Sequence, residues 1–323
     1  MITLKVCRKG NLKMDLSREN LNTIFGILAI LLWGTTIAFS RSLAEQLGPI
    51  TAASWIYMLS GIWSCIYLFS KTERIKKTLQ LPLSYLIGCG IIFVFYMVCL
   101  YLAVGLAFSR EQVIEVSIIN YLWPGLTLVF SLPILHKKGK IMLIPGIIIA
   151  FVGFYLATVN SRMFSWETFK GNFQVNYLPY LFAFIAAISW GLYSNLVRRW
   201  AGHVEVGAVP LFLLATGLIL TTIRLIFPEE SCWTPRAVVE LLYMSVFPTF
   251  LAYTFWDRAM RKGNIILVAS LSYFTPLLSI IVSSLYLQVV IKPTLWIACA
   301  LVIAGAIVCK FSIIDKTQEK STF

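Results

Sequence analysis

The sequence is poor in charge and in histidine. Charged residues make up 13% of the 323 residues, about half the share of a soluble domain, so an ordinary soluble protein is excluded. The two histidines, His136 and His203, fall in expected loops, and the seven cysteines form no Cys-x-x-Cys pair. We therefore expect no metal site and no cofactor.

Enzyme signatures are also lacking. The sequence has no Gly-rich phosphate loop, no Gly-x-Ser-x-Gly and no His-Glu-x-x-His, and its apolar segments contain no histidine and no acid pair. This predicts a protein that is not an enzyme. With no nucleotide-binding domain it is not itself an ATP-driven pump, and no ATPase subunit is evident. Its net charge of +13 lies in short loops, which argues against nucleic acid.

Long apolar runs dominate what is present. Hydrophobic residues make up 59% of the chain, and the mean hydropathy is +0.82. Ten apolar stretches of about 19–25 residues can each cross the hydrocarbon core of a lipid bilayer as a helix. The sequence predicts an all-α membrane protein with ten transmembrane helices. They are expected near residues 22–43, 50–70, 82–106, 111–135, 141–159, 178–200, 207–227, 236–258, 265–288 and 293–312.

The distribution of lysine and arginine predicts the orientation of the chain in the membrane. Ten spans put both termini on one side, and that side carries all but seven of the 27 Lys and Arg residues. The positive-inside rule places it in the cytoplasm. The basic N-terminus resembles a signal peptide, but the apolar run after it is too long and lacks a cleavage site, so we expect an uncleaved first span.

Two short motifs recur at one spacing. Tyr121-x-x-Pro124 and Tyr273-x-x-Pro276 are 152 residues apart, as are Gly153 and Gly305. Five spans per half would make the two halves face opposite ways, which gives an inverted repeat, an arrangement of transporters whose substrate sites lie between the repeats. The predicted divisions are a basic cytoplasmic N-tail (1–21), two five-helix repeats (22–159 and 178–312), an outer linker (160–177) and a cytoplasmic C-tail (313–323).

The fourth span carries a polar stripe. Ser117, Asn120, Tyr121 and Pro124 share one helical face, which should look into a cavity, while Pro124 kinks the helix. The alternative is a kink with Asn120 bonded to a neighbouring helix. Glu115 is expected to be the only acid well inside a span. It is a candidate for proton coupling, or else it pairs with an outer arginine such as Arg41.

The ninth span repeats this pattern with Ser272, Thr275, Pro276 and Ser279, and Pro276 is the second candidate kink. Hydroxyls on such a stripe serve helix packing about as readily as ligand binding. Asp257 adjoins Arg258 and Arg261 and is expected to belong to a surface charge cluster rather than to a coupling site. Aromatic side chains that could form cavity walls for a flat apolar or cationic ligand, or else pack, are Trp33, Tyr96, Tyr101, Trp190, Tyr193, Tyr253 and Trp256.

The run Glu115-Val-x-x-x-Asn-Tyr-Leu-Trp-Pro124, together with Ser272-Tyr-Phe-Thr-Pro276, resembles bacterial aromatic amino-acid exporters of the YddG type. These belong to the EamA-like branch of the drug/metabolite transporter (DMT) superfamily. The sequence departs from their pattern at Gly34-Thr35 and at Met97. The resemblance implies an inner-membrane location and a cavity near Trp33, Tyr96, Asn120, Tyr121, Trp123, Trp190 and Tyr273, to which our patterns add Tyr193 and Thr275 as substrate-binding candidates.

Our leading hypothesis from the sequence is export of amino acids, aromatic ones (Phe, Tyr, Trp) first, by alternating access. Facilitated diffusion and proton coupling fit the sequence equally well. The alternative is a transporter of the same superfamily with another cargo, such as a drug cation, a nucleotide sugar or an S-adenosylmethionine-like cofactor, with import as well as export left open.

Overall fold

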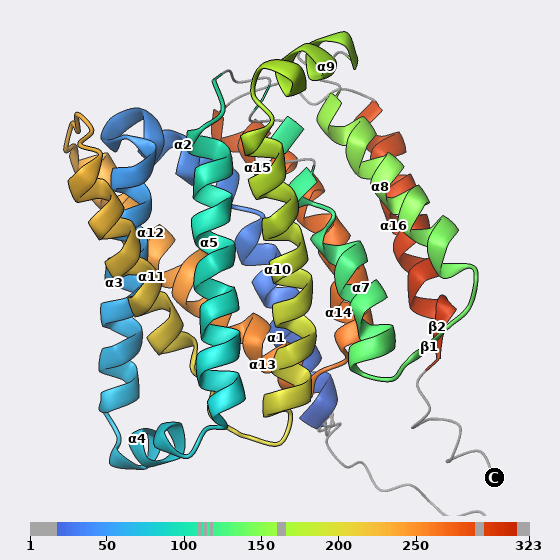
Figure 1. Cartoon of the computed structure of the whole chain (residues 1–323), viewed down its shortest axis with the longest axis horizontal. Coiled ribbons are helices and arrows are strands. Elements are labelled where there is room, and N and C mark those ends of the chain that lie inside the picture. Colours follow the sequence, from blue (N-terminus) through green and yellow to red (C-terminus); the bar gives the residue numbers. More distant parts are fainter. Residues whose placement is uncertain are drawn as a thin grey trace, which may run out of the picture.

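The computed structural model of the chain describes residues 18–108, 112, 115–116, 119–159, 166–287 and 294–314. Over these residues the fold is a bundle of helices (Figure 1). The one strand pairing within these ranges is antiparallel and joins β1 (Lys138–Gly139) to β2 (Ile313–Ile314). The expectation of an all-α membrane protein is confirmed at this level.

Six helical segments of the described chain are long and apolar enough to cross a membrane. Three of them are divided: Arg18–Leu47 into α1 and α2, Ser84–Val104 into the π-helical η1 and α5, and Pro235–Lys262 into α12, η2 and α13. The bounds of these elements are α1 Arg18–Trp33, α2 Thr36–Leu47, α3 Pro49–Phe69, η1 Ser84–Cys89, α5 Gly90–Gly105, α10 Leu178–Ala201, α11 Val209–Ile226, α12 Pro235–Met244, η2 Ser245–Leu251 and α13 Ala252–Lys262.

Shorter apolar helices occupy the other four expected stretches. They are α7 Trp123–Ile134, α8 Leu143–Val159, α14 Ile265–Leu271 with η3 Ser272–Phe274 and α15 Thr275–Leu287, and α16 Thr294–Ser312. Two further helices lie at opposite ends of the bundle (Figure 1): α4 Thr72–Leu79, and α9 Trp166–Val175 in the outer linker. The β1–β2 pair lies at the α4 end.

Local sequence explains several helix starts. Proline stands at the first or second position of α3, α10, α11 and α12, where its missing N–H would have no helical partner. Thr234 caps α12 by accepting a hydrogen bond from the Ala237 amide, and Asn264 caps α14 by accepting one from the Leu267 amide.

The most extensive helix pairings are α8 with α16, α3 with α11, α5 with α10, and α1 with α13. The first two pairs are seen side by side in Figure 1. Glycine permits their close approach. A Cβ on Gly305 would lie 2.4 Å from the backbone nitrogen of Ala150, and one on Gly217 would lie 2.7 Å from that of Met58. Small residues at such crossings bring helix backbones into contact within a membrane.

Two spans are interrupted just before a proline. Residues 121–122 form a turn, and Pro124 is the second residue of α7. In the ninth span the η3 turn separates α14 from α15, and Pro276 is the second residue of α15. Both prolines therefore begin a new helical segment, where the fixed φ of proline is compatible with the first turn.

Candidate functional site

Four tryptophans from four spans meet inside the bundle, and we call them the tryptophan cluster: Trp33 of α1, Trp123 of α7, Trp190 of α10 and Trp256 of α13. The ring centroid of Trp33 lies 6.4 Å from that of Trp123, 5.8 Å from that of Trp190 and 5.1 Å from that of Trp256. Trp123, Trp190 and Trp256 are buried. Both halves of the chain therefore contribute to one aromatic centre.

Further rings surround the cluster. The centroids of Tyr96 and Tyr193 lie 4.7 and 5.1 Å from that of Trp190. Tyr253 lies 5.3 Å from Trp33, and Phe93 lies 5.3 Å from Tyr253. Aromatic rings arranged in this way have the chemistry to pack against a flat apolar side chain or a delocalised cation.

Two indole N–H groups of the cluster have hydrogen-bond partners. Trp33 Nε1 donates to the carbonyl oxygen of Pro248 at 3.0 Å, and Trp256 Nε1 donates to Ser194 Oγ at 3.2 Å. A buried N–H would otherwise cost about 1–3 kcal/mol. These bonds set the orientation of two rings without using their faces.

Tyrosine hydroxyls lie beside the cluster. The hydroxyls of Tyr57 and Tyr253 are 3.2 Å apart, and that of Tyr57 also lies 3.1 Å from the sulfur of Met97. Sulfur is a weak acceptor. A carboxylate or carbonyl of a solute would accept more strongly from these hydroxyls than Met97 does.

The interrupted fourth span places three predicted residues near the other half. Asn120 is buried, its side chain interacts with the Tyr96 hydroxyl, and its Oδ1 has no hydrogen-bond partner among the described residues. The Tyr121 hydroxyl lies near Ser279 of α15. A Cβ on Gly125 would lie 2.8 Å from the hydroxyl of Tyr273. The two Tyr-x-x-Pro segments thus approach each other.

Unpaired hydroxyls gather on the ninth span. Within the described ranges, Ser270 Oγ and Thr275 Oγ1 are buried without a hydrogen-bond partner. A buried polar atom without a partner is costly, so these hydroxyls are candidates for contact with a polar solute. Ser117 and the side chain of Pro276 fall outside the described residues.

Glu115 joins the expected fourth span to α9. Its side chain is 1% exposed, Tyr180 Oη donates to Oε2, and Asn172 Nδ2 lies 3.3 Å from both carboxylate oxygens. Asn172 belongs to α9, whose Phe169 and Phe173 also pack on Tyr180. The alternative pairing with Arg41 involves a side chain outside the described part of the chain.

Two expectations about acids were wrong. Asp257 is 1% exposed and Arg261 3% exposed, so they do not belong to a surface cluster, and Glu240 at 3% is a third buried acid besides Glu115. The reason is that each carboxylate pairs with an arginine four residues away. The packing of the bundle buries both partners of the Asp257 pair but only the carboxylate of the Glu240 pair. The (i, i+4) spacing of Asp257 and Arg261 was the signal that could have revealed this.

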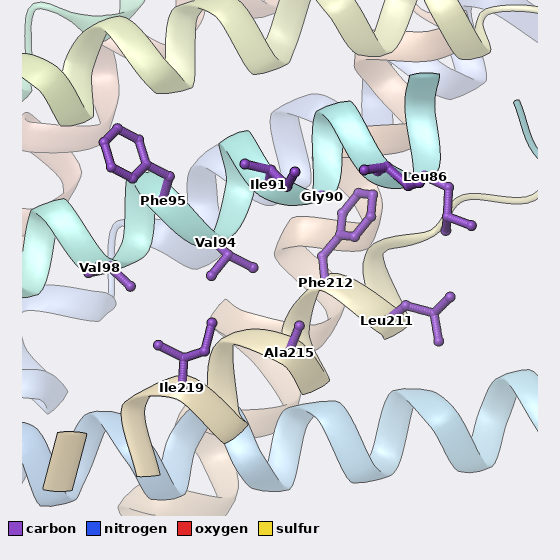
Figure 2. Close-up of a pocket in the computed structure, with 11 residues that line it drawn as sticks. Leu86, Gly90, Ile91, Val94, Phe95, Val98, Leu211, Phe212, Ala215 and Ile219 are labelled. Carbon is purple, nitrogen blue, oxygen red and sulfur yellow. The ribbon is translucent and has the colours of Figure 1, made fainter. Parts of the chain in front are cut away.

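A described pocket lies elsewhere. It has a volume of about 580 Å³ between α5 and α11 (Figure 2), and Ile91, Val94, Phe95, Phe212 and Ile219 are among its lining residues. Its lining is apolar, and Ile91 and Phe95 are exposed as membrane-facing side chains are. The tryptophan cluster, with its neighbouring polar atoms, is better suited to an amphipathic solute.

A membrane-spanning helical bundle with interrupted spans and an internal aromatic centre defines a multi-pass membrane transporter. The EamA-like transporter family matches residues 21–159 and again 178–310, and the chain belongs to this family. The family's name and the names of similar proteins are those of transporters and not of enzymes.

Similar proteins include aromatic amino acid exporters. The protein named "Aromatic amino acid exporter YddG" of Escherichia coli is 30% identical over 287 residues, which cover 89% of this chain and 96% of that protein. The protein of the same name from Salmonella typhimurium is also 30% identical, with the same coverage. A solved crystal structure matches with a TM-score of 0.77 at 25% identity, over 91% of this chain and 97% of that one.

Proposed function

We propose that this transporter exports amino acids with aromatic side chains, Phe, Tyr and Trp, by alternating access. The observation that carries the proposal is the tryptophan cluster, an internal aromatic site built by both halves of the chain. The names of the two 30% identical relatives support the same cargo. Facilitated and proton-coupled export are both compatible with this proposal.

The architecture that we propose is ten spans in two inverted five-helix repeats around a central cavity, with repeats at 22–159 and 178–312. The helix pairings support it. We match each span of the first half to the span five places later in the second half. The α5–α10 pair then corresponds to the α13–α1 pair, and the pairs α3–α11 and α8–α16 each correspond to themselves. That is the pattern expected of a pseudo-two-fold axis. The two separate family matches also support the division.

Each candidate residue then has a role. Trp33, Trp123 and Trp190, with Tyr96 and Tyr193, would hold the aromatic ring of the solute. Asn120 Oδ1 would accept from its ammonium group, while hydroxyls would donate to its carboxylate. The hydroxyl-bearing candidates are Tyr121, Tyr273 and Thr275. The breaks before Pro124 and Pro276 would let two half-spans move, and they free backbone carbonyls near the site.

For Glu115 we infer that its main role is to hold α9 against the fourth and sixth spans. The hydrogen bonds from Asn172 and Tyr180 support this role. Proton coupling is the alternative. It requires Glu115 to exchange protons during the cycle, which the substitution Glu115→Gln tests.

We propose the cytoplasmic (inner) membrane of a bacterium as the location, with both termini in the cytoplasm. The distribution of Lys and Arg supports this orientation. The end of the bundle that carries α4 and the β1–β2 pair would face the cytoplasm, and the end that carries α9 would face outward (Figure 1).

Thermal stabilisation of the purified protein by a panel of solutes tests the cargo. A solute that binds the folded state raises the melting temperature, by an amount that grows with the logarithm of its concentration over its Kd. We expect stabilisation by Phe, Tyr and Trp and none by Lys or Asp. Stabilisation only by a drug cation, a nucleotide sugar or S-adenosylmethionine would replace the amino-acid proposal with the alternative cargo.

A further inference from the structure

A buried ion pair lies at the end of span eight that we assign to the cytoplasm. Arg261 Nε donates to Asp257 Oδ2 at 2.8 Å within α13, and the two side chains are 3% and 1% exposed. Removing two charges from water costs several kcal/mol per ion unless further hydrogen bonds compensate. The groups that hydrogen-bond to this pair therefore show which parts of the bundle stabilise it.

The pair is tied to three other parts of the bundle. Tyr85 Oη of η1 donates to Asp257 Oδ1 at 2.7 Å, and Tyr193 Oη of α10 lies 3.4 Å from the same atom. Arg261 Nη1 donates to the carbonyl oxygen of Val204, in the loop between α10 and α11, at 2.7 Å. Spans three, six and eight and this loop thus meet at one charged centre.

The loop is packed tightly onto this centre. The Ala208 amide donates to Tyr85 Oη at 2.9 Å, and a Cβ on Gly207 would lie 2.3 Å from Asp257 Oδ2. Arg198 of α10 donates from Nη1 to the Arg261 carbonyl oxygen at 2.7 Å. The loop is therefore in close contact with Asp257 at Gly207.

This centre is directly connected to the aromatic site. Tyr193 stacks on Trp190 with centroids 5.1 Å apart while its hydroxyl faces Asp257. Tyr193 therefore separates the proposed solute site from the charged centre. A solute leaving the tryptophan cluster toward the α4 end would have to part Tyr193, Tyr85 and Asp257.

We propose that Asp257, Arg261, Tyr85 and Tyr193 form the inner gate of the transport pathway, closed in this structure and opened when the α10–α11 loop and η1 withdraw from Asp257. The inference rests on the alternating-access mechanism proposed above. In this proposal Asp257 and Arg261 stabilise the closed state. Tyr193 links solute binding at the aromatic site to this pair, because it stacks on Trp190 and its hydroxyl faces Asp257.

Span eight offers a matched control at its other end. Arg236 Nε donates to Glu240 Oε1 at 2.7 Å, again with (i, i+4) spacing, and Tyr286 Oη donates to the same oxygen at 2.7 Å. Glu240 is buried, but the Arg236 side chain is 61% exposed. The two ends thus share their chemistry and differ in burial and in the side of the membrane.

Cys89 is a native reporter for the gate. It is the last residue of η1, it is fully buried, and it interacts electrostatically with Asp257 and Tyr193. In a protein whose other six cysteines are alanine, a membrane-impermeant maleimide should label Cys89 only when the gate opens. The labelling rate in inverted vesicles then follows the open population.

We expect Tyr85→Phe and Asp257→Asn each to raise Cys89 labelling in inverted vesicles by about tenfold, the shift for one lost charge-assisted hydrogen bond. Labelling in right-side-out vesicles should stay unchanged, and Glu240→Gln should not raise it in inverted vesicles. Unchanged labelling in both gate variants, with full labelling after denaturation, would overturn the gate. An equal rise in Glu240→Gln would also overturn it, by indicating general loosening. The labelling assay needs no transported solute. If Cys89 labelling rises only in inverted vesicles and no amino acid is transported, the gate stands and only the proposed amino-acid cargo is refuted.

Discussion

The indole N–H of Trp33 is bonded to the backbone carbonyl oxygen of Pro248, 215 residues away, at 3.0 Å. Pro248 lies in the π-helical η2, between the two ion pairs of span eight. π-Helical turns within membrane helices are frequent at functional sites and hinges. This bond therefore joins a ring of the proposed solute site to the π-helical turn of span eight.

The first prediction concerns this bond. Trp33→Phe keeps an aromatic ring beside Trp256 and leaves the Pro248 carbonyl without its donor, which should cost about 1–3 kcal/mol in the conformation seen here. We expect the rate of amino-acid exchange to change by about fivefold or more, with a smaller change in apparent affinity. Exchange kinetics in proteoliposomes measure both. A pure loss of affinity at unchanged maximal rate would contradict the coupling.

The second prediction concerns Asn120, whose Oδ1 we assign to the solute's ammonium group. Asn120→Ala should weaken phenylalanine binding by about tenfold, the value of one hydrogen bond to a charged group. Binding of 3-phenylpropionate, which lacks the ammonium, should barely change. Competition binding with both compounds measures the difference. Equal weakening for both compounds would mean that Asn120 only supports the packing of Tyr96.

The third prediction concerns α9. Glu115→Gln keeps the size of the side chain but weakens acceptance from Asn172 and Tyr180. We expect faster hydrogen exchange over Trp166–Val175 and unchanged stimulation of transport by a pH gradient. Hydrogen-exchange mass spectrometry and flux assays measure the two. If pH-gradient stimulation is abolished instead, Glu115 is the proton-coupling residue.

The fourth prediction concerns a helix crossing. Gly305→Val places side-chain atoms where the Ala150 backbone lies, so α8 and α16 must separate at a cost of about 1–3 kcal/mol. The melting temperature in detergent should fall by several degrees. Gly171→Val on α9 is the matched control, because nothing lies within 4 Å of a Cβ there. A fall of similar size in both variants would point to a general effect of valine.

Much of the fold could be predicted from the sequence, because apolar runs long enough to span a bilayer leave few structural alternatives. The positions of Pro124 and Pro276 also indicated where two spans are interrupted. Aromatic candidates such as Trp33, Trp123 and Trp190 come together in the structure, since each lies on the inward side of its helix.

The burial of Asp257 could not be predicted in the same way. Its neighbours Arg258 and Arg261 resemble a surface cluster in sequence, and only the packing of Tyr85 and the α10–α11 loop removes water from it. Tyr57 and Phe93 were missed for a related reason. Neither stands beside a polar stripe or a proline, and their roles follow from contacts made between distant spans.

Counterflow of radiolabelled phenylalanine into proteoliposomes tests the central claim most directly. Vesicles preloaded with unlabelled tryptophan, tyrosine or phenylalanine should accumulate label, and those preloaded with lysine should not. The same vesicles with Trp190→Ala should lose most of this uptake, because the ring at the middle of the tryptophan cluster is gone. Absence of exchange with every aromatic amino acid, from protein shown to be folded, would contradict the proposal that this transporter carries them.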